Sequence, residues 1–267
     1  MSGHQAAWIE LDGAVNVRDV GGLPTVDGRV TRSGVLMRAD NLQDLTEADV
    51  SHLLTVRMLR TVIDLRSSGE LHLEGRSPLQ ATAVRHHHLS LIPEYVGESD
   101  LVEVDRAMPT RSHRAGASRT DMSGYYIGYL QDAPRNVAAA LRLLADADTG
   151  AAVVHCAAGK DRTGTIVALA LSLVGVTREA VVADYVRSAE RVDRVLDRLK
   201  ASTTYAADLA HSTVDDVRPV AGSIERLLDH VDAEYGGVHG LAMAIGVDEQ
   251  TVARLGARLV GTSPRTH

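Results

Sequence analysis

The chain of 267 residues contains one cysteine, one tryptophan and no phenylalanine. A single cysteine excludes an intramolecular disulfide, so the fold does not depend on an oxidising compartment. Aromatic residues make up 3% of the sequence, too few for the stacking platforms of proteins that bind single-stranded nucleic acid. The hydrophobic core must therefore consist mainly of leucine, valine and alanine.

The sequence also lacks an excess of basic residues. Its formal net charge is −7, so no global positive field attracts nucleic acid, and we expect no nucleic-acid partner. The first residues, 1–11, lack the charged start and apolar run of a signal peptide, and no apolar stretch is long enough to span a membrane. These absences favour a cytoplasmic protein, with non-classical export left open.

Short apolar runs alternate with helical periodicity in the first two thirds of the chain. We expect strands at 29–37, 61–65, 83–91 and 151–154. We expect helices from Thr46, at 125–147, at 165–174, from Thr177 through about 200, from Ser223 to Gly236, and from Asp248. This order predicts an α/β fold in which helices flank a central, partly parallel sheet.

The domain organisation follows from two further segments. Residues 94–123 have mixed charge, glycine, serine and little periodicity, which is typical of a mobile lid or insertion, or of a plain surface loop. Residues 201–267 read as helices alone, and we expect them to form a C-terminal helical layer on the sheet. The whole chain, 1–267, is therefore predicted to be one domain.

The chemistry is concentrated in residues 155–164, His-Cys-Ala-Ala-Gly-Lys-Asp-Arg-Thr-Gly. An apolar strand leads into Cys156, a tight loop follows, and a helix begins as the loop ends. Successive backbone N–H groups in such a loop converge on one point at the positive end of the helix dipole. That potential favours the thiolate form of Cys156, which is a strong nucleophile toward phosphorus.

The same loop is a cradle for a phosphate dianion. The expected phosphate-binding residues are Ala157, Ala158, Gly159, Lys160, Asp161 and Arg162. Arg162 stands six residues after Cys156, where it can fold back and hold two equatorial phosphate oxygens in the transition state. Thr163 is expected to hydrogen-bond the sulfur, and His155 to orient the loop from behind.

A run of three histidines, 86–88, invites comparison with a metal site. Alternate residues of a strand face opposite sides of the sheet, so three consecutive histidines cannot converge on one ion. No complementary set of cysteine or aspartate ligands stands out either. We therefore expect no metal and no other cofactor.

Residues 155–164 resemble the Cys-x5-Arg loop of the protein tyrosine phosphatase superfamily, in particular bacterial tyrosine and lipid phosphatases typified by mycobacterial and listerial members. Further blocks similar to that family lie at 16–22, 32–34, 64–67, 183–188 and 235–247. The resemblance implies a phosphatase fold, a Cys156 nucleophile, an Arg162 clamp and no metal. Within the first block, Arg18 and Asp19 either support the loop or stabilise a turn.

Two positions depart from the family pattern, and they bear on the substrate. Val17 stands where the family has phenylalanine, and Ala157 where the mycobacterial type carries an aromatic residue. Lys160 adds charge to the cradle and is shared by related lipid-active phosphatases, unless it only pairs with Asp161 in solvent. The expected substrates are phosphotyrosine proteins, phosphoinositides or both, with a small phosphorylated metabolite such as a nucleoside or sugar phosphate as the alternative.

Hydrolysis of a phosphate ester also needs a general acid for the leaving oxygen. The chain has no Trp-Pro-Asp tripeptide, since its one tryptophan is Trp8. The resemblance points to Asp161 as the acid. Asp64 is the second candidate, although it serves equally well to hold a turn or pair with an arginine, and Asp121 is the third.

Two functions of other classes stay open. Rhodanese-type sulfur transfer also uses a cysteine on a loop between strand and helix, but the Arg162-Thr163-Gly164 ending argues against it. An inactive phosphate-binding module is the non-enzyme alternative, and the intact Cys156 and Arg162 argue against that.

Overall fold

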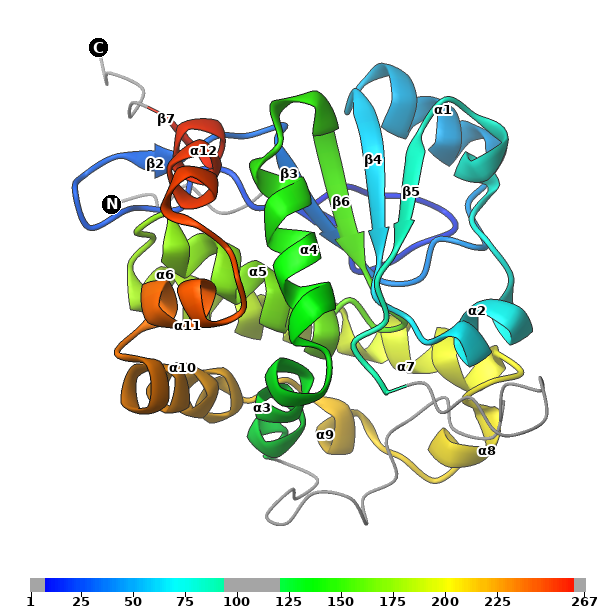
Figure 1. Ribbon diagram of the computed structural model, residues 1–267. Helices are drawn as coiled ribbons and strands as arrows, with labels where there is room; N and C mark the ends of the chain where they lie inside the picture. Colours follow the sequence, from blue (N-terminus) through cyan, green and yellow to red (C-terminus); the bar gives the residue numbers. More distant parts are fainter. Residues whose placement is uncertain (1–7, 94–120, 262–267) are drawn as a thin grey trace, which may run out of the picture.

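The computed structural model describes residues 8–93 and 121–261 (Figure 1). The expected lid or insertion at 94–123 lies almost wholly outside the described residues. A five-stranded sheet has the order β1-β3-β6-β4-β5. Its strands are β1 (Arg18–Asp19), β3 (Leu36–Ala39), β6 (Ala151–His155), β4 (Leu59–Asp64) and β5 (Arg85–His88). β3, β6, β4 and β5 run parallel, and β1 is antiparallel to β3, which confirms the partly parallel sheet.

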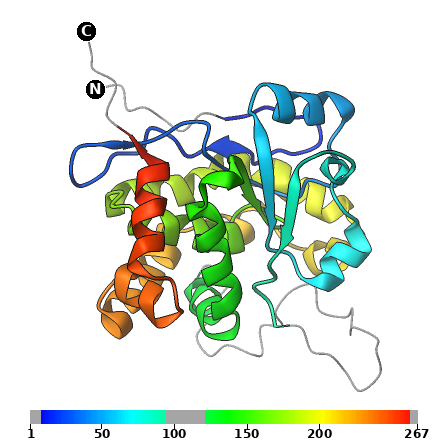
Figure 2. The ribbon, with the colours of Figure 1, turned by 45° about the horizontal axis from the view of Figure 1, so that its top comes forward.

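Helices and loops cover the sheet on both faces. The helices are α1 (Glu47–Thr55), α2 (Ser68–Glu74), α3 (Ser123–Asp132), α4 (Pro134–Ala145), α5 (Asp161–Leu173), α6 (Arg178–Val186), α7 (Val192–Ala201), α8 (Ala206–Leu209), α9 (Val214–Val217), α10 (Ala221–Tyr235), α11 (Val238–Ala244) and α12 (Glu249–Leu259). Figure 2 shows α1 on one side of the sheet and α4 with α12 on the other.

The hydrophobic core is divided by the sheet. In β6, Ala152 and Val154 face the larger core, which is built from α3 to α6 and α10 to α12. Ala151 and Val153 face the smaller one, against α1 and the N-terminal segment. A strand buried on both faces reads as a continuous apolar run, which is why the sequence located β6 so well.

Several expected elements are divided in the structure. The strand expected at 29–37 is two strands, because Gly34 turns the chain with φ +76°. One is β3, and the other is β2 (Val30–Thr31), which pairs with β7 (Val260–Gly261) near the C-terminal end. The helix expected at 125–147 is α3 and α4, and it breaks at Pro134, which cannot continue the first helix but suits the start of the second.

The helix expected from Thr177 is also interrupted. Thr177 caps α6 as expected, accepting a hydrogen bond from the backbone of Ala180. A 3-10 turn, Arg187–Arg191, then separates α6 from α7, so no single helix extends from Thr177 to about 200. The helices expected from Thr46 and Asp248 are α1 and α12, for which these residues are the N-caps, and α10 ends at Gly236, as expected.

Residues from 201 onward do not all lie in one place. The helices α10 and α12 pack on α3 and α4 as an outer layer, whereas α8 and α9 lie beside α7 at the carboxyl edge of the sheet (Figure 1). Within the described ranges, no helix combines the length and the apolar character needed to cross a membrane.

Candidate active site

The loop between β6 and α5, residues 156–160, is termed the catalytic loop. Asn41 donates its backbone N–H to the Ala157 carbonyl at 3.0 Å, so the loop is tied to the end of β3. Gly159 has φ +64°, and a Cβ there would lie 2.5 Å from the carbonyl carbon of Ala39. Only glycine fits both the backbone conformation and this close approach.

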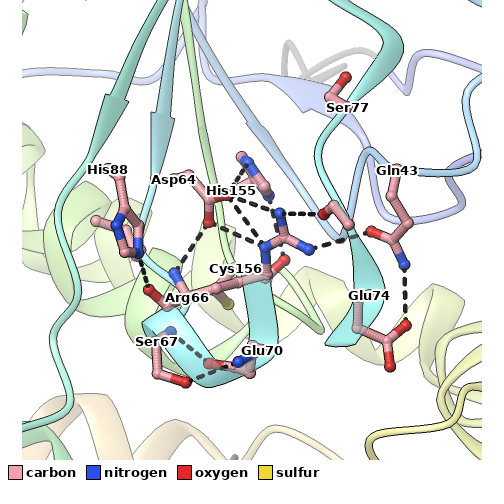
Figure 3. Close-up of polar contacts among 12 residues, drawn as sticks. Gln43, Asp64, Arg66, Ser67, Glu70, Glu74, Ser77, His88, His155 and Cys156 are labelled. Atoms are coloured by element: carbon pink, nitrogen blue, oxygen red, sulfur yellow. Dashed lines mark hydrogen bonds and ion pairs between the residues drawn. The ribbon is translucent and has the colours of Figure 1, made fainter. Parts of the chain in front are cut away.

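Cys156 follows the last residue of β6 and precedes the N-terminus of α5, a helix of 13 residues. The first turn of a helix presents unpaired backbone N–H groups and the positive end of the dipole. The cysteine is a free thiol and 1% exposed, and Figure 3 shows it beside the ends of β4 and β6. The predicted strand, loop and helix around Cys156 are therefore present.

Arg162 lies in the first turn of α5, and its side chain holds the carboxylate of Glu70. Nη2 donates to Oε1 at 2.7 Å, and Nη1 is paired with Oε2. Burial raises the pKa of Glu70, but the charge and hydrogen bonds of Arg162 outweigh it and keep the pKa below its usual range. The Arg162 guanidinium is thus fixed end-on by a buried counter-ion.

Glu70 is a site residue that the sequence reasoning missed. It is the third residue of α2 and closes a capping box with Ser67, whose backbone N–H donates to Oε2 at 2.6 Å. The Ser-x-x-Glu spacing at 67–70 is a local signal for that helix start. It does not reveal Arg162, which is 92 residues away in the sequence.

A second buried network holds the catalytic loop from behind. Arg38 donates from Nη2 to the Gly159 carbonyl at 2.9 Å and from Nη1 to Asp184 at 2.5 Å. Arg18 donates from Nε to the other oxygen of Asp184 at 2.9 Å. Asn16 donates to the Ala158 carbonyl at 2.9 Å and lies within 3.4 Å of Ser188. These five residues, Asn16, Arg18, Arg38, Asp184 and Ser188, are termed the support network.

The charges of the support network shift the pKa values of its members. Burial raises the pKa of Asp184, but Arg18 and Arg38 outweigh it and lower that pKa to about 2. Burial and the charge of Arg38 lower the pKa of Arg18 to about 10. Two roles were left open for Arg18 and Asp19 in the first block. Arg18 belongs to the support network of the catalytic loop. Asp19 accepts from the backbones of Gly21 and Gly34 and stabilises a turn.

The two charged residues at the end of the catalytic loop face different elements. Asp161 accepts a hydrogen bond on Oδ1 from the Tyr126 hydroxyl at 2.5 Å. Its Oδ2 lies 3.5 Å from Nζ of Lys160. Lys160 donates to the Val217 carbonyl at 2.6 Å, so its ammonium group is anchored on α9 as well as paired with Asp161.

Asp64 is held at the carboxyl end of β4 by positive charge. Arg66 donates to it at 2.7 Å, and Nε2 of His155 lies 3.5 Å away (Figure 3). Burial raises the pKa of Asp64, but His155 and Arg66 outweigh it and hold the pKa well below its usual range. Burial lowers the pKa of His155 to about 4, so the ring is neutral at pH 7. These contacts favour the structural role of Asp64 over that of an acid.

The remaining expected residues lie in separate surroundings. Asp121 accepts from the Ser123 backbone at the start of α3 and pairs with Arg226 at 3.0 Å. Thr163 is fully buried, and its hydroxyl has no hydrogen-bond partner within the described residues, so the expected hydrogen bond to the sulfur of Cys156 is absent. His88 contacts the Arg66 carbonyl at 2.8 Å, and no three potential ligands for a metal ion cluster anywhere in 8–93 or 121–261.

A segment from the C-terminal part of the chain covers the catalytic loop. Leu199, Tyr205 and Leu209 pack against Ala157. The Tyr205 hydroxyl donates to Glu70, and the Thr204 backbone donates to Glu74 at 2.9 Å. Residues 199–217 are therefore termed the covering segment, and they join the loop to α2.

The chain is similar to known phosphatases along most of its length. The model of the tyrosine phosphatase family matches residues 9–261. The triple specificity protein phosphatase PtpB of Mycobacterium tuberculosis is 30% identical over 94% of this chain and 99% of its own length. A tyrosine-protein phosphatase of Nostoc commune is 29% identical over 84% of this chain and 73% of its own.

A distant likeness exists to the crystal structure of P. aeruginosa TpbA, with a TM-score of 0.38 and 17% identity over 81% of this chain and 96% of that one. The family match extends across the sheet, the catalytic loop and the covering segment alike. This chain therefore belongs to the tyrosine phosphatase family and is a cysteine-dependent phosphatase.

Proposed function

We propose that this protein hydrolyses phosphate monoesters through a phosphocysteine intermediate on Cys156. The observation that carries the proposal is the position of the only cysteine, at the N-terminus of α5 in a loop closed by Arg162. A cysteine-dependent phosphatase with one cysteine has no other candidate for the nucleophile. Backbone N–H groups of residues 157–162 are the proposed phosphate ligands.

The reaction has two steps. In the first, the Cys156 thiolate attacks phosphorus, the S–P bond forms, and the P–O bond to the leaving group breaks. Arg162 stabilises the charge of the equatorial oxygens, and the carboxyl group of Asp161 gives its proton to the leaving oxygen. In the second, water attacks phosphorus, Asp161 takes the proton back, the P–S bond breaks, and the thiolate of Cys156 is regenerated.

Glu70, His155 and the support network act on these groups without touching the substrate. The end-on pair with Glu70 uses Nη1 and Nη2 of Arg162 and so fixes the plane of the guanidinium. Arg38 and Asn16 bind the carbonyl groups of the catalytic loop, which turns the N–H groups of the same peptides toward the anion. His155, neutral and buried, closes the end of β6 against Asp64.

The proposed substrates are phosphotyrosine proteins, phosphoinositides or both. Relatives named as a tyrosine-protein phosphatase and as a triple specificity protein phosphatase support this range. A nucleoside or sugar phosphate remains the alternative, because the loop chemistry is the same for any monoester.

The test is steady-state hydrolysis over a panel of esters without added metal, for the wild type and Cys156→Ser. The panel holds p-nitrophenyl phosphate, phosphotyrosine and phosphoserine peptides, phosphoinositides, and sugar and nucleoside monophosphates. We expect turnover by the wild type only, with the highest kcat/KM identifying the substrate class. Equal turnover by both proteins contradicts the proposal, and binding of phosphate esters without turnover favours an inactive phosphate-binding module.

A separate comparison tests the place of Lys160 in substrate choice. Its ammonium group is committed to Val217 and Asp161, so a second phosphate group must compete with those contacts. If phosphoinositides are substrates, Lys160→Gln lowers kcat/KM for them by about tenfold and leaves phosphotyrosine peptides within a factor of two or three. An equal loss on both substrates assigns Lys160 to the loop structure alone.

A further inference from the structure

Two buried tyrosines extend the hydrogen bonds of Asp161 away from the catalytic loop. The hydroxyl of Tyr126 in α3 lies 2.5 Å from Oδ1 of Asp161, and the hydroxyl of Tyr185 in α6 lies 2.7 Å from that of Tyr126. The two tyrosines are 0% and 1% exposed. The two-step reaction uses neither of them, although Tyr185 belongs to the block 183–188.

Each hydrogen bond between these hydroxyl groups and Asp161 has a defined donor and acceptor. Burial, and next the charge of Asp161, raise the pKa of both tyrosines, so both keep their protons. An ionised carboxyl group only accepts hydrogen bonds, so Tyr126 donates to Asp161. Its oxygen then accepts from Tyr185. The chain Tyr185 to Tyr126 to Asp161 therefore stabilises negative charge on Asp161 and supplies no proton to it.

The same contacts distinguish the two oxygens of Asp161. Oδ1 is occupied by Tyr126, so Oδ2 is the oxygen left to carry a transferable proton. Oδ2 lies 3.5 Å from Nζ of Lys160, which is anchored on Val217. Residues from α3, the catalytic loop and α9 thus fix the orientation of a side chain that is itself on α5.

The last glycine of the 155–164 motif makes room for the second tyrosine. A Cβ at Gly164 would lie 2.9 Å from Cδ2 of Tyr185, which is closer than real contacts allow. The ring of Tyr185 also packs edge-on against the ring of Tyr126, with 6.1 Å between centroids. The motif therefore contains both the acid, Asp161, and the small residue that admits the support of that acid.

We propose that Tyr126, supported by Tyr185, is a positioning residue that holds Asp161 so that Oδ2, the oxygen beside Lys160, carries the transferable proton, and that stabilises the carboxylate that forms. This inference rests on the proposed function, since it takes Asp161 as the general acid. As the S–P bond forms and the P–O bond breaks, the proton on Oδ2 moves to the leaving oxygen. The hydrogen bond from Tyr126 is stronger to a carboxylate than to a neutral acid, so it strengthens in that transition state.

The experiment compares Tyr126→Phe with Tyr125→Phe. Tyr125 lies next to it on α3 and is also buried, at 5% exposed against 0% for Tyr126. Its hydroxyl makes no hydrogen bond within the described residues, so the control removes the same atom without touching Asp161. The readout is kcat/KM on phenyl phosphate, whose leaving group needs an acid, and on p-nitrophenyl phosphate, whose leaving group does not. For Tyr126→Phe we expect a loss of about tenfold on phenyl phosphate alone.

The pH profile gives a readout that a purely structural role does not move. Without Tyr126, the carboxylate of Asp161 is less stable, so the protonated acid persists to higher pH. We expect the alkaline limb of kcat/KM for phenyl phosphate to move upward by about one pH unit in Tyr126→Phe. Tyr185→Phe keeps the donor to Asp161 and is expected to give the same shifts at about a third of their size, which provides a second variant if the first is poorly folded.

The variant Asp161→Asn distinguishes a failure of the positioning role of Tyr126 from a failure of the proposed phosphocysteine mechanism. With asparagine at 161, adding Tyr126→Phe is expected to change neither the rate ratio nor the pH profile further. Equal losses on both esters, or the same result for Tyr126→Phe and Tyr125→Phe, overturn the positioning role alone. If Asp161→Asn retains full turnover of phenyl phosphate while Cys156→Ser is inactive, the acid assignment and this inference both fail, and the cysteine mechanism stands.

Discussion

The catalytic loop is held from two sides that differ in kind. Behind it, the support network contacts main-chain carbonyl groups through side chains that are buried and mutually paired. On the other side, Glu70 contacts Arg162, to which we assign a role in the proposed reaction, and Tyr205 contacts Glu70. Side chains that bind the backbone set the geometry of the proposed anion site, whereas contacts on the side chains proposed to be catalytic set the orientation of individual groups and the access of solvent.

The largest expected effect is on the support network. Asp184→Asn leaves Arg18 and Arg38 fully buried with no counter-charge, and breaking a buried ion pair in this way costs about 3–5 kcal/mol. We expect a loss of that size in the free energy of unfolding in urea. The control is Asp229→Asn, since the exposed pair of Asp229 with Arg178 contributes less than about 1 kcal/mol. Similar losses in the two variants would contradict the distinction.

The pH dependence of the free energy of unfolding tests the effect of burial on His155, which lies beside Asp64. Its pKa in the folded protein is about 4, below the 6.5 of the unfolded chain, because burial favours the neutral ring. The stability from this residue is therefore complete above pH 6.5 and is lost as the pH falls toward 4, by roughly 3 kcal/mol in all. Urea denaturation between pH 7 and 4 measures it, and His155→Gln is expected to flatten that part of the curve. An unchanged slope would contradict the account.

Glu70→Gln tests the contact of Glu70 with Arg162. The amide keeps the shape but removes the charge that fixes the guanidinium, and we expect kcat/KM to fall by about 10- to 100-fold on p-nitrophenyl phosphate. Glu74→Gln on the same helix is the matched control, because Glu74 contacts Gln43 and Thr204 and not the arginine. An equal loss of activity in Glu74→Gln would contradict this account. It would mean that α2 affects activity through its contact with the covering segment and not through Arg162.

The smallest expected effect concerns the covering segment. Tyr205→Phe removes one hydroxyl contact with Glu70 and leaves the packing on Ala157, so stability falls by about 1 kcal/mol. We expect alkylation of Cys156 by iodoacetamide to become about two to five times faster, because the thiol is reached when this segment opens. The chain has no other cysteine, so the label is unambiguous. Unchanged alkylation would mean that opening does not depend on Tyr205.

The sequence predicted the parts of the site that are local in the chain. Cys156, Arg162 and the glycine of the loop stand within one motif, and the apolar run before them marks β6. The sequence did not predict partners that the fold brings together. Glu70 is 92 residues from Arg162 and Tyr126 is 35 residues from Asp161, and no sequence spacing encodes either contact. The block 183–188 was noticed, but that Asp184 lies behind the loop depends on how α6 packs.

The fold was predicted in the same uneven way. Buried strands and capped helix starts have local causes, so β4, β6 and the caps of α1, α6 and α12 were found. The breaks were missed. Pro134 is itself a local signal for a helix boundary, whereas the turn after Val186 has no glycine or proline and is set by packing.

The most direct test of the central claim is rapid acid quenching of the enzyme during turnover of p-nitrophenyl phosphate, followed by mass spectrometry of its peptides. We predict one phosphoryl group on the peptide that contains Cys156 in the wild type, and none in Cys156→Ser. A phosphoryl group on another residue, or turnover with no adduct at any quenching time, would contradict a phosphocysteine intermediate.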